Sequence, residues 1–235
     1  MSTRFTNKTI LVAGGTGGLG RAVSLAFLEE DANVIVTYRK QEEFEALKKS
    51  PNLQGFVLDV TDEGAVRDVV EQILAKHGRL DALVNGVGGY AGGVKFWDAD
   101  AKVFDLMLAL NLRSGYALSR AVVPAMLKQG HGSIVNVAAK AAVDHPAGAG
   151  FYAASKAAAV ALMDSLAADL RGTGVRVNSV LPSIIDTDAN RKAMPQADFT
   201  KWPKPEEIAR VILFLCSEDA KVVHGASIPV YGDSA

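Results

Sequence analysis

The sequence lacks the features that mark secreted, membrane-bound or nucleic-acid-binding proteins. Its 235 residues include one cysteine, Cys216, so no disulfide can form within the chain. No apolar run approaches the length of a membrane span, and the first residues lack the apolar stretch of a signal peptide. The net charge is −1, so no basic surface is expected to attract nucleic acid or an anionic membrane. We therefore expect a cytoplasmic protein that binds neither nucleic acid nor membrane.

The composition also argues against a metal site and against disorder. None of the four histidines has a partner at metal-ligand spacing, so no metal is predicted. Cys216 ends the apolar run VILFLC and is interpreted as a buried thiol. Hydrophobic residues make up 49% of the chain and charged residues 22%, which is enough for a large buried core. We expect residues 1–235 to form one domain.

Short apolar segments alternate with longer segments of helical spacing. Strands are predicted at 9–14, 33–38, 55–60, 81–86, 133–137, 175–181 and 227–231, and helices at 18–30, 62–77, 101–128, 152–170 and 205–216. The strand segments are continuously apolar, which is typical of strands covered on both faces. The alternation predicts an α/β fold of Rossmann type, a doubly wound seven-stranded parallel sheet with helices on both faces.

The longest segment without clear periodicity is 182–204. Long loops in compact domains are usually functional. This one follows a predicted strand, and open α/β sheets bind ligands at the carboxyl ends of their strands. We interpret 182–204 as a substrate loop.

A glycine-rich stretch, AGGTGGLGR, links the first predicted strand to the first predicted helix at 13–21. Its glycines fit the dinucleotide fingerprint, in which the backbone approaches a pyrophosphate at the start of a helix. No Gly-Lys-Ser/Thr follows, which excludes a P-loop, and a merely tight turn is the alternative. The predicted cofactor-binding residues here are Gly14, Thr16, Gly17, Gly18, Leu19 and Gly20.

Arg39 follows the second predicted strand, where an acidic residue would favour NAD(H). An arginine there suits a 2′-phosphate, so NADP(H) is the preferred cofactor and NAD(H) remains possible. The alternative is a solvated basic turn. Asp59 and Val60 follow the third strand, and Asn85 and Gly86 the fourth. These four residues lie where the adenine and its ribose would pass.

Taken together, these motifs resemble the short-chain dehydrogenase/reductase family over essentially the whole chain. The family's order is matched by the glycine loop, LDV at 58–60, DALVNGVGG at 81–89, Asn111 in LALNLRSG, Tyr152-x-x-x-Lys156 and VRVNSVLPSIIDT at 175–187. The resemblance implies that Tyr152 is the general acid and that Lys156 binds the nicotinamide ribose and lowers the tyrosine pKa. It implies that Asn111 holds a water of the proton relay.

The same resemblance extends to the nicotinamide end of the cofactor. It implies that Thr187 and the Ile185 backbone hold the carboxamide, with Pro182 beside them.

The spacing of Tyr152 and Lys156 gives independent physical support for their pairing. Residues i and i+4 share one helix face, so both side chains can reach one ligand. A free tyrosine titrates near pH ~10. The ammonium of Lys156 and an oxidised nicotinamide are two cations that would lower this pKa toward neutrality.

Three positions depart from the family pattern. The usual Asn-Asn-Ala-Gly is Asn85-Gly86-Val87-Gly88, and Ser183 replaces a glycine. The third departure is chemical, because Ala139 stands where the family's serine should fall. No neighbour obviously replaces this serine, since Ser133 lies at the start of the strand. Lys140 and His145 are the possible substitutes, and each is more readily explained as a loop or surface residue.

Dihydropteridine reductases within the family also lack this serine and share the pattern AKAA-D-P before Tyr-x-x-x-Lys. The loop here resembles theirs as well, at Leu181-Pro182, Asp186-Thr187, Asn190-Arg191-Lys192, Met194-Pro195, Ala197-Asp198-Phe199 and Trp202. Members of that group carry an acid after the second strand, where this chain has Arg39. The resemblance implies substrate contacts at Ala139, Tyr152, Asn190, Phe199 and Trp202.

The sequence thus predicts an NADPH-dependent reductase for an activated conjugated small molecule, either quinonoid dihydropterin-like or quinone-like. One alternative is an ordinary short-chain carbonyl reductase or dehydrogenase that acts on another ketone or alcohol. Another is a non-catalytic NADP(H)-binding redox sensor. The predicted helices 101–128 and 152–170 are rich in alanine and leucine, and such helices pair across two-fold axes in this family. We therefore expect a homodimer or homotetramer.

Overall fold

Seven strands in the described residues, 4–47 and 49–234 of a computed structural model, form one parallel sheet. They are β1 (Thr9–Ala13), β2 (Asn33–Tyr38), β3 (Leu53–Val57), β4 (Ala82–Asn85), β5 (Gly132–Val137), β6 (Val175–Pro182) and β7 (Ser227–Val230). Their order across the sheet is β3-β2-β1-β4-β5-β6-β7. The order reverses between β1 and β4, which creates the switch point where open α/β sheets bind ligands. The predicted Rossmann-type fold is confirmed.

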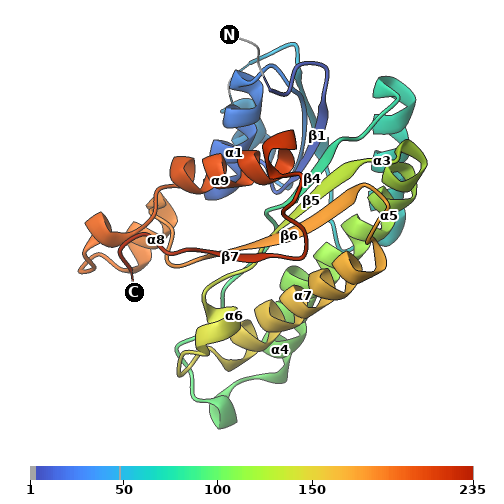
Figure 1. Cartoon of the computed structure of the whole chain (residues 1–235). Coiled ribbons are helices and arrows are strands. Elements are labelled where there is room, and N and C mark those ends of the chain that lie inside the picture. Colours follow the sequence, from blue (N-terminus) through green and yellow to red (C-terminus); the bar gives the residue numbers. More distant parts are fainter. Residues whose placement is uncertain (1–3, 48, 235) are drawn as a thin grey trace.

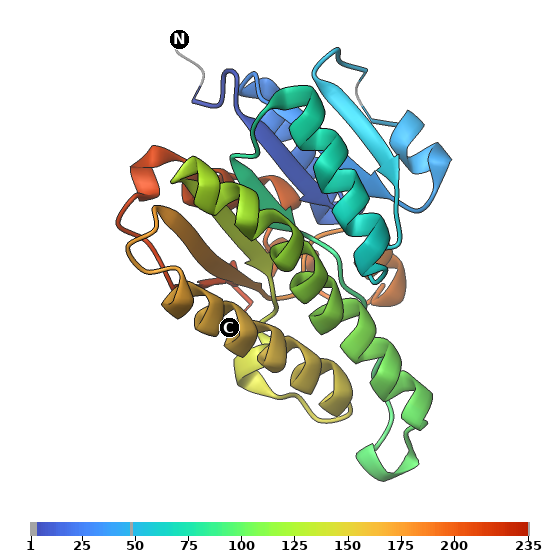
Figure 2. The same ribbon diagram turned by 90° about the vertical axis from the view of Figure 1, so that its right-hand side faces the viewer.

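Helices cover both faces of this sheet. The longer ones are α1 (Gly18–Glu29), α3 (Glu63–His77), α4 (Ala101–Leu108), α5 (Ser114–Gln129), α7 (Gly150–Asp169) and α9 (Pro205–Cys216). Shorter elements are α2 (Gln41–Glu45), α6 (Ala141–Asp144), α8 (Asp188–Ala193), η1 (Phe96–Asp98), η3 (Phe199–Lys201) and η4 (Glu218–Ala220). Figure 1 shows α1 and α9 together on one face, and Figure 2 shows α3, α5 and α7 across the other. Within the described ranges, every helix falls short of the length and apolarity that a bilayer crossing requires.

Burial on both faces explains why the strands are continuously apolar. All five residues of β1 are buried. Leu11 packs into the core beneath α3, α5 and α7, whereas Ile10 and Val12 pack into the core beneath α1 and α9. Because successive side chains of a strand point to opposite faces, a strand between two helix layers needs an apolar residue at every position.

The third strand lies earlier than the apolar run 55–60 predicts. β3 spans Leu53–Val57 and pairs with β2 in parallel register. Beyond it, the Asp59 carboxylate accepts hydrogen bonds from the backbone N–H of Thr61 at 3.0 Å and from its hydroxyl at 2.7 Å. Such a local side-chain turn competes with strand pairing, which explains why the strand stops at Val57.

The single helix predicted at 101–128 is divided in two. Between α4 and α5, the segment Ala109–Arg113 forms a π-helical turn, η2. Asn111 lies in this turn and is 2% exposed. One-turn π-bulges are rare and recur at functional sites, and apolar spacing does not reveal them.

The predicted substrate loop 182–204 contains α8 and η3 and is held by its own side chains. The Arg191 guanidinium pairs with the Asp186 carboxylate at 2.5 Å and 2.7 Å. It also lies over the Phe199 ring, 5.0 Å from its centroid, and Phe199 packs against Trp202 at 4.9 Å between centroids. The Ser234 hydroxyl donates to the Lys201 carbonyl at 2.9 Å, so the C-terminal segment also holds this loop.

A buried carboxylate, Asp81, joins β1 and β4 at the amino ends of the strands. It accepts hydrogen bonds from the Thr9 N–H at 2.9 Å and the Arg79 Nε at 2.7 Å, and the Lys8 Nζ lies at 3.4 Å. Burial alone would raise the pKa of Asp81. The hydrogen bonds from Arg79 and Thr9 and the charges of Lys8 and Arg79 outweigh burial, so the pKa lies below its ordinary value of 3.8.

Replacement of this carboxylate is expected to change the acid sensitivity of the fold. Because the pKa of Asp81 is lower in the folded protein, its contribution is complete above about pH 4 and is lost as the pH falls further. Asp81→Asn should therefore cost about 3 kcal/mol at pH 7 and show a weaker loss of stability below pH 4. Urea unfolding from pH 3 to pH 7 measures this. The exposed Asp105→Asn variant, as control, should unfold like the wild type. If the free energies of unfolding of Asp81→Asn and wild type fall in parallel below pH 4, the lowered pKa of Asp81 is contradicted.

Candidate active site

The glycine loop between β1 and α1 is held by the end of β2. Gly14 donates from its N–H to the Thr37 hydroxyl at 3.0 Å, and Gly15 donates to the Thr37 carbonyl at 3.2 Å. Gly14 has a φ of 71°, in the left-handed region that favours glycine. A Cβ at Gly20 would lie 2.0 Å from the Gly14 carbonyl oxygen. Gly20 is therefore required for the close packing of α1 on the loop.

The start of α1 fits the pyrophosphate of a dinucleotide. Gly17 and Gly18 are exposed there, and Gly17 caps the helix without any side-chain hydrogen bond. The first N–H groups of a helix have no partner within it and favour an anion. A Cβ at Gly18 would lie 2.7 Å from the Thr187 Cγ2, so Thr187, which follows β6, meets the glycine loop. Thr16 and Leu19, from the same loop, are half-buried.

Arg39 is exposed at the end of β2, where the sequence predicts a cofactor phosphate contact. The pKa of Asp59 lies below its ordinary value, mainly because of the two Thr61 hydrogen bonds and to a lesser degree because of the Arg39 charge. Nearby, the Glu43 carboxylate accepts a hydrogen bond from the Thr16 hydroxyl at 3.1 Å and pairs with Lys40 at 3.2 Å. Glu43 is an acidic neighbour of the glycine loop that sequence reasoning missed, because it lies in α2, beyond the strand end.

Asn85 and Gly86 lie at the end of β4, beside the glycine loop. Gly86 donates from its N–H to the Ala13 carbonyl at 3.0 Å. The Asn85 amide donates to the Asn136 Oδ1 at 3.0 Å, which links β4 to β5. Val60 is buried in the core, so its backbone is the part that can face a ligand.

Tyr152, Lys156 and Asn111 are brought together by α7 and η2. The Lys156 side chain is 5% exposed, and its Nζ donates to the Val137 carbonyl at 2.9 Å. A Cβ at Gly88 would lie 2.9 Å from the Asn111 Oδ1 and 3.0 Å from the Lys156 Nζ. The glycine at 88 therefore leaves room for both side chains.

The Asn111 side chain connects the loop after β4 with α7. Its Oδ1 accepts from the Gly89 N–H at 2.9 Å, and its Nδ2 donates to the Gly89 carbonyl and to the Ser155 Oγ, both at 3.0 Å. The Ser155 hydroxyl donates to the Tyr152 carbonyl at 2.8 Å. Ser155 was missed by sequence reasoning, although it lies inside the Tyr-x-x-x-Lys motif.

The pKa values in the protein alone differ from the expected pattern. Burial, with a further contribution from Tyr90, raises the pKa of Tyr152 to about 12. Burial lowers the pKa of Lys156 to about 8. Burial disfavours the phenolate, so in the protein alone the pKa of Tyr152 lies above its ordinary value and not below it. The Tyr152 phenol stays protonated at neutral pH.

Tyr90 is a second side chain that the sequence did not single out. Its ring packs edge-on against the Tyr152 ring, with 5.0 Å between centroids. It lies in the glycine-rich segment after β4, where the only signal is an aromatic residue between glycines.

The end of β5 places alanines, and not a hydroxyl, before the tyrosine helix. Ala138 and Ala139 are buried. The Lys140 Nζ lies over the Tyr231 ring at 5.2 Å from its centroid and donates to the Ser234 carbonyl at 3.4 Å. The Ser133 hydroxyl donates to the Leu215 carbonyl at 3.0 Å. Ser133 and Lys140 are therefore engaged elsewhere, and His145 is exposed.

The predicted residues of the 182–204 loop form local contacts. The Ile185 carbonyl accepts from the Thr187 N–H and from the Asn190 Nδ2, both at 2.8 Å, and the Pro182 carbonyl accepts from the Lys140 N–H at 2.7 Å. Trp202 is 7% exposed, so it packs as an anchor of the loop. Within the described residues, no hydrogen bond or ring contact joins Asn190, Phe199 or Trp202 to Tyr152 or Ala139. Their contact with a substrate stays a prediction.

Over the described ranges, no group of three or more His, Cys, Asp or Glu side chains is placed to hold a metal ion. Burial raises the pKa of the Cys216 thiol to about 12.

The buried Lys156 is expected to change how the free energy of unfolding depends on pH. Its pKa is about 8 in the folded protein and 10.5 ordinarily, so the charged form opposes folding. This cost is complete below about pH 8 and disappears as the pH rises toward 10.5. Wild type should therefore gain stability relative to Lys156→Met between pH 8 and pH 10.5 in urea unfolding. The exposed Lys102→Met variant, as control, should keep the pH profile of the wild type. If the difference in free energy of unfolding between Lys156→Met and wild type stays constant from pH 8 to pH 10.5, burial of the charged lysine is refuted.

Comparison with known proteins places this geometry in a family. The model of the short chain dehydrogenases matches residues 8–198. The chain is 35% identical to the 3-oxoacyl-(acyl-carrier-protein) reductase FabG of Thermotoga maritima, over 97% of this chain and 98% of that protein. It is 32% identical to dehydrogenase/reductase SDR family member 4 of Oryctolagus cuniculus, over 96% and 93%.

Solved structures agree with these relatives. ElxO with NADP bound matches with a TM-score of 0.89 and 27% identity, over 96% of this chain and 97% of that one. A short-chain type dehydrogenase/reductase from Mycobacterium ulcerans matches with a TM-score of 0.91 and 27% identity, over 97% and 90%. The seven-stranded parallel sheet with helices on both faces is thus an architecture shared with these structures. The chain belongs to the short chain dehydrogenase family and is an NAD(P)-dependent oxidoreductase.

Proposed function

We propose that the protein is an NADPH-dependent reductase that acts on an activated conjugated substrate, such as a quinonoid dihydropterin or a quinone. The observation that carries this proposal is the buried alanine pair Ala138 and Ala139. It directly follows Val137, whose carbonyl accepts a hydrogen bond from Lys156 of the tyrosine helix. The neighbouring polar residues do not replace the hydroxyl, since Ser133 and Lys140 are engaged elsewhere and His145 is exposed.

The missing donor favours a substrate that needs little polarisation. In carbonyl reduction, a hydroxyl donor stabilises the oxygen that gains charge, and loss of one such donor typically costs 10²–10³ in rate, about 3–4 kcal/mol. A quinonoid or imine-like ring spreads the developing charge over its own conjugated system. Such a substrate is electrophilic without the donor.

The chain's own residues supply the proton and the shape of the site. When bound, the reduced cofactor contributes a hydride. The Tyr152 phenol, whose pKa is about 12, holds its proton at neutral pH and gives it to the substrate atom that gains charge. Lys156 lies on the same face of α7 as Tyr152, and its Nζ donates to the Val137 carbonyl. It would hold the nicotinamide ribose. The relay water at Asn111 stays part of this proposal.

The preference for NADPH rests on Arg39. Its exposed guanidinium, close enough to Asp59 to affect that carboxylate, is free to pair with a 2′-phosphate. The solved ElxO structures contain NADP in one case and NADPH in the other. Glu43 acts in the opposite sense, because its carboxylate repels a phosphate near Thr16.

A second candidate is an ordinary carbonyl reductase. It is favoured by the 35% identity to a 3-oxoacyl-(acyl-carrier-protein) reductase. A redox sensor without catalysis is disfavoured, because decay of the site would be expected to touch Tyr152, Lys156 or Asn111, and all three are present.

We also propose that the protein forms a homodimer or homotetramer through α5 and α7. Tyr116 and Leu127 of α5 are exposed at 40% and 45%. An open groove of about 340 Å³ runs between the two helices and includes Val123 and Leu166. A second copy of this face would cover these apolar groups.

A substrate panel with Ala139→Ser tests the proposed function. Wild type with NADPH should reduce quinonoid dihydropterin or a simple quinone faster than any ketone in the panel, followed by loss of NADPH absorbance. Ala139→Ser should raise kcat/KM for ketones by about 10²–10³ and change the quinone rate little. Tyr152→Phe, as control, should abolish turnover but keep NADPH affinity. Turnover confined to ketones in the wild type would overturn the proposal in favour of the carbonyl reductase, and tight NADPH binding without any turnover would favour the sensor.

Cofactor preference is tested at Arg39 and Glu43. Arg39→Asp should weaken NADPH by tenfold or more relative to NADH, because it removes a charge-assisted hydrogen bond of ~1.5–3 kcal/mol. Glu43→Gln should shift the ratio toward NADPH. The measurement is the ratio of kcat/KM for the two cofactors. An unchanged ratio in Arg39→Asp would show that this arginine does not read the 2′-phosphate.

A further inference from the structure

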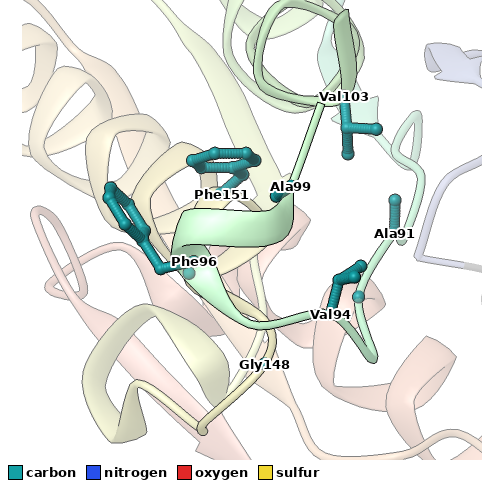
Figure 3. Close-up of a pocket in the computed structure, with 9 residues that line it drawn as sticks. Ala91, Val94, Phe96, Ala99, Val103, Gly148 and Phe151 are labelled. Carbon is teal, nitrogen blue, oxygen red and sulfur yellow. The ribbon is translucent and has the colours of Figure 1, made fainter. Parts of the chain in front are cut away.

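An open apolar pocket of about 80 Å³ lies beneath the segment 91–99, next to the tyrosine helix. Every residue that lines it is a glycine, alanine, valine or phenylalanine. Figure 3 shows the side chains of Phe96 and Phe151 on one side of the pocket, with those of Val103, Ala91 and Val94 on the other. The pocket thus offers an apolar group van der Waals contact and no hydrogen bond from a side chain.

Two residues that line the pocket are the chain neighbours of tyrosines at the proposed active site. Phe151 directly precedes Tyr152, and Ala91 directly follows Tyr90, whose ring packs edge-on against Tyr152. The two loops that meet here are joined by a hydrogen bond from the Gly93 N–H to the Gly148 carbonyl at 2.9 Å. The lining of the pocket thus comes within one residue of both members of the Tyr90–Tyr152 ring pair.

Apolar surface around the pocket is left uncovered. Tyr90, Phe96 and Trp97 are 67%, 71% and 78% exposed. Phe151 contacts two aromatic rings, Phe96 at 5.4 Å and Phe104 at 5.2 Å between centroids. Isolated exposed apolar residues are ordinary, but a group of aromatic residues beside a pocket marks a surface that binds something apolar.

We propose that this pocket is a substrate subsite that takes a compact apolar substituent, such as a short alkyl chain, on the conjugated ring that faces Tyr152. The inference rests on the proposed function. The pocket holds about three heavy atoms, since a water occupies ~30 Å³ in the liquid. The substrate is accordingly a quinonoid or quinone-like ring with a small hydrocarbon branch, rather than a bare polar heterocycle.

Ala99 provides a way to close the pocket without touching the catalytic groups. It lines the pocket beside η1 and is half-buried. Ala99→Leu adds three carbons, which is the volume of the proposed substituent. Ala101→Leu is the matched control, because Ala101 is exposed at the start of α4 and does not line the pocket.

The turnover test uses 1,4-benzoquinone and its 2-methyl, 2-propyl and 2-hexyl derivatives with NADPH. In wild type and Ala101→Leu, kcat/KM should rise about fourfold per added carbon up to propyl, the factor that corresponds to about 0.8 kcal/mol per buried methylene. It should then level off at hexyl. Ala99→Leu should lose the rise while keeping the rate for unsubstituted quinone. Identical series in Ala99→Leu and wild type would overturn the subsite.

A binding test separates this proposal from the proposed function. In the full chain, 2-propylphenol should bind at least tenfold more tightly than phenol by calorimetry, and this difference should vanish in Ala99→Leu but not in Ala101→Leu. This result, with no turnover of any quinone or of quinonoid dihydropterin, would sustain the subsite and overturn the proposed function. Equal binding of both phenols by wild type would overturn the subsite. A change of association state in Ala99→Leu, with the selectivity unchanged, would assign the pocket to an interface between copies and likewise overturn it.

Discussion

The arrangement of the site depends on the hydrogen bonds of one buried amide, the side chain of Asn111. It joins the loop after β4, through both backbone groups of Gly89, to α7, through Ser155. Ser155 is bonded in turn to the Tyr152 carbonyl, so the first turn of the catalytic helix is positioned by this contact. A buried amide without these partners would be costly, which is why the π-helical turn that presents Asn111 is maintained.

Burial beside this amide shifts the pKa values of Tyr152 and Lys156. Desolvation raises the pKa of Tyr152 and lowers that of Lys156, so the protein alone favours a neutral phenol and a readily deprotonated amine. Both shifts favour the neutral form of the pair in the absence of another charge. A positively charged nicotinamide would act on the tyrosine in the opposite sense, and the direction of proton transfer would then follow the redox state of the cofactor.

Several features could be predicted from the sequence because they depend on neighbours in the chain. The glycine loop, the Tyr152–Lys156 pair and the alternation of strands and helices are all local patterns, and the fold class and family they predict are confirmed. The misplaced third strand and the missed π-helical turn have a common reason. Each depends on a specific hydrogen bond or packing contact, at Asp59 and at Asn111, that apolar periodicity does not report.

The sequence by itself therefore determined the sheet and the position of the glycine loop, and it predicted the catalytic side chains, because these follow from periodicity and short spacings. Only the tertiary structure decided how the site is completed. It brought Thr187 against Gly18, Glu43 against Thr16 and Tyr90 against Tyr152. It also directed Lys140 toward the C-terminal segment. The physical reason is that these pairs lie far apart in the chain, and their contact is set by how the strand ends converge on one edge of the sheet.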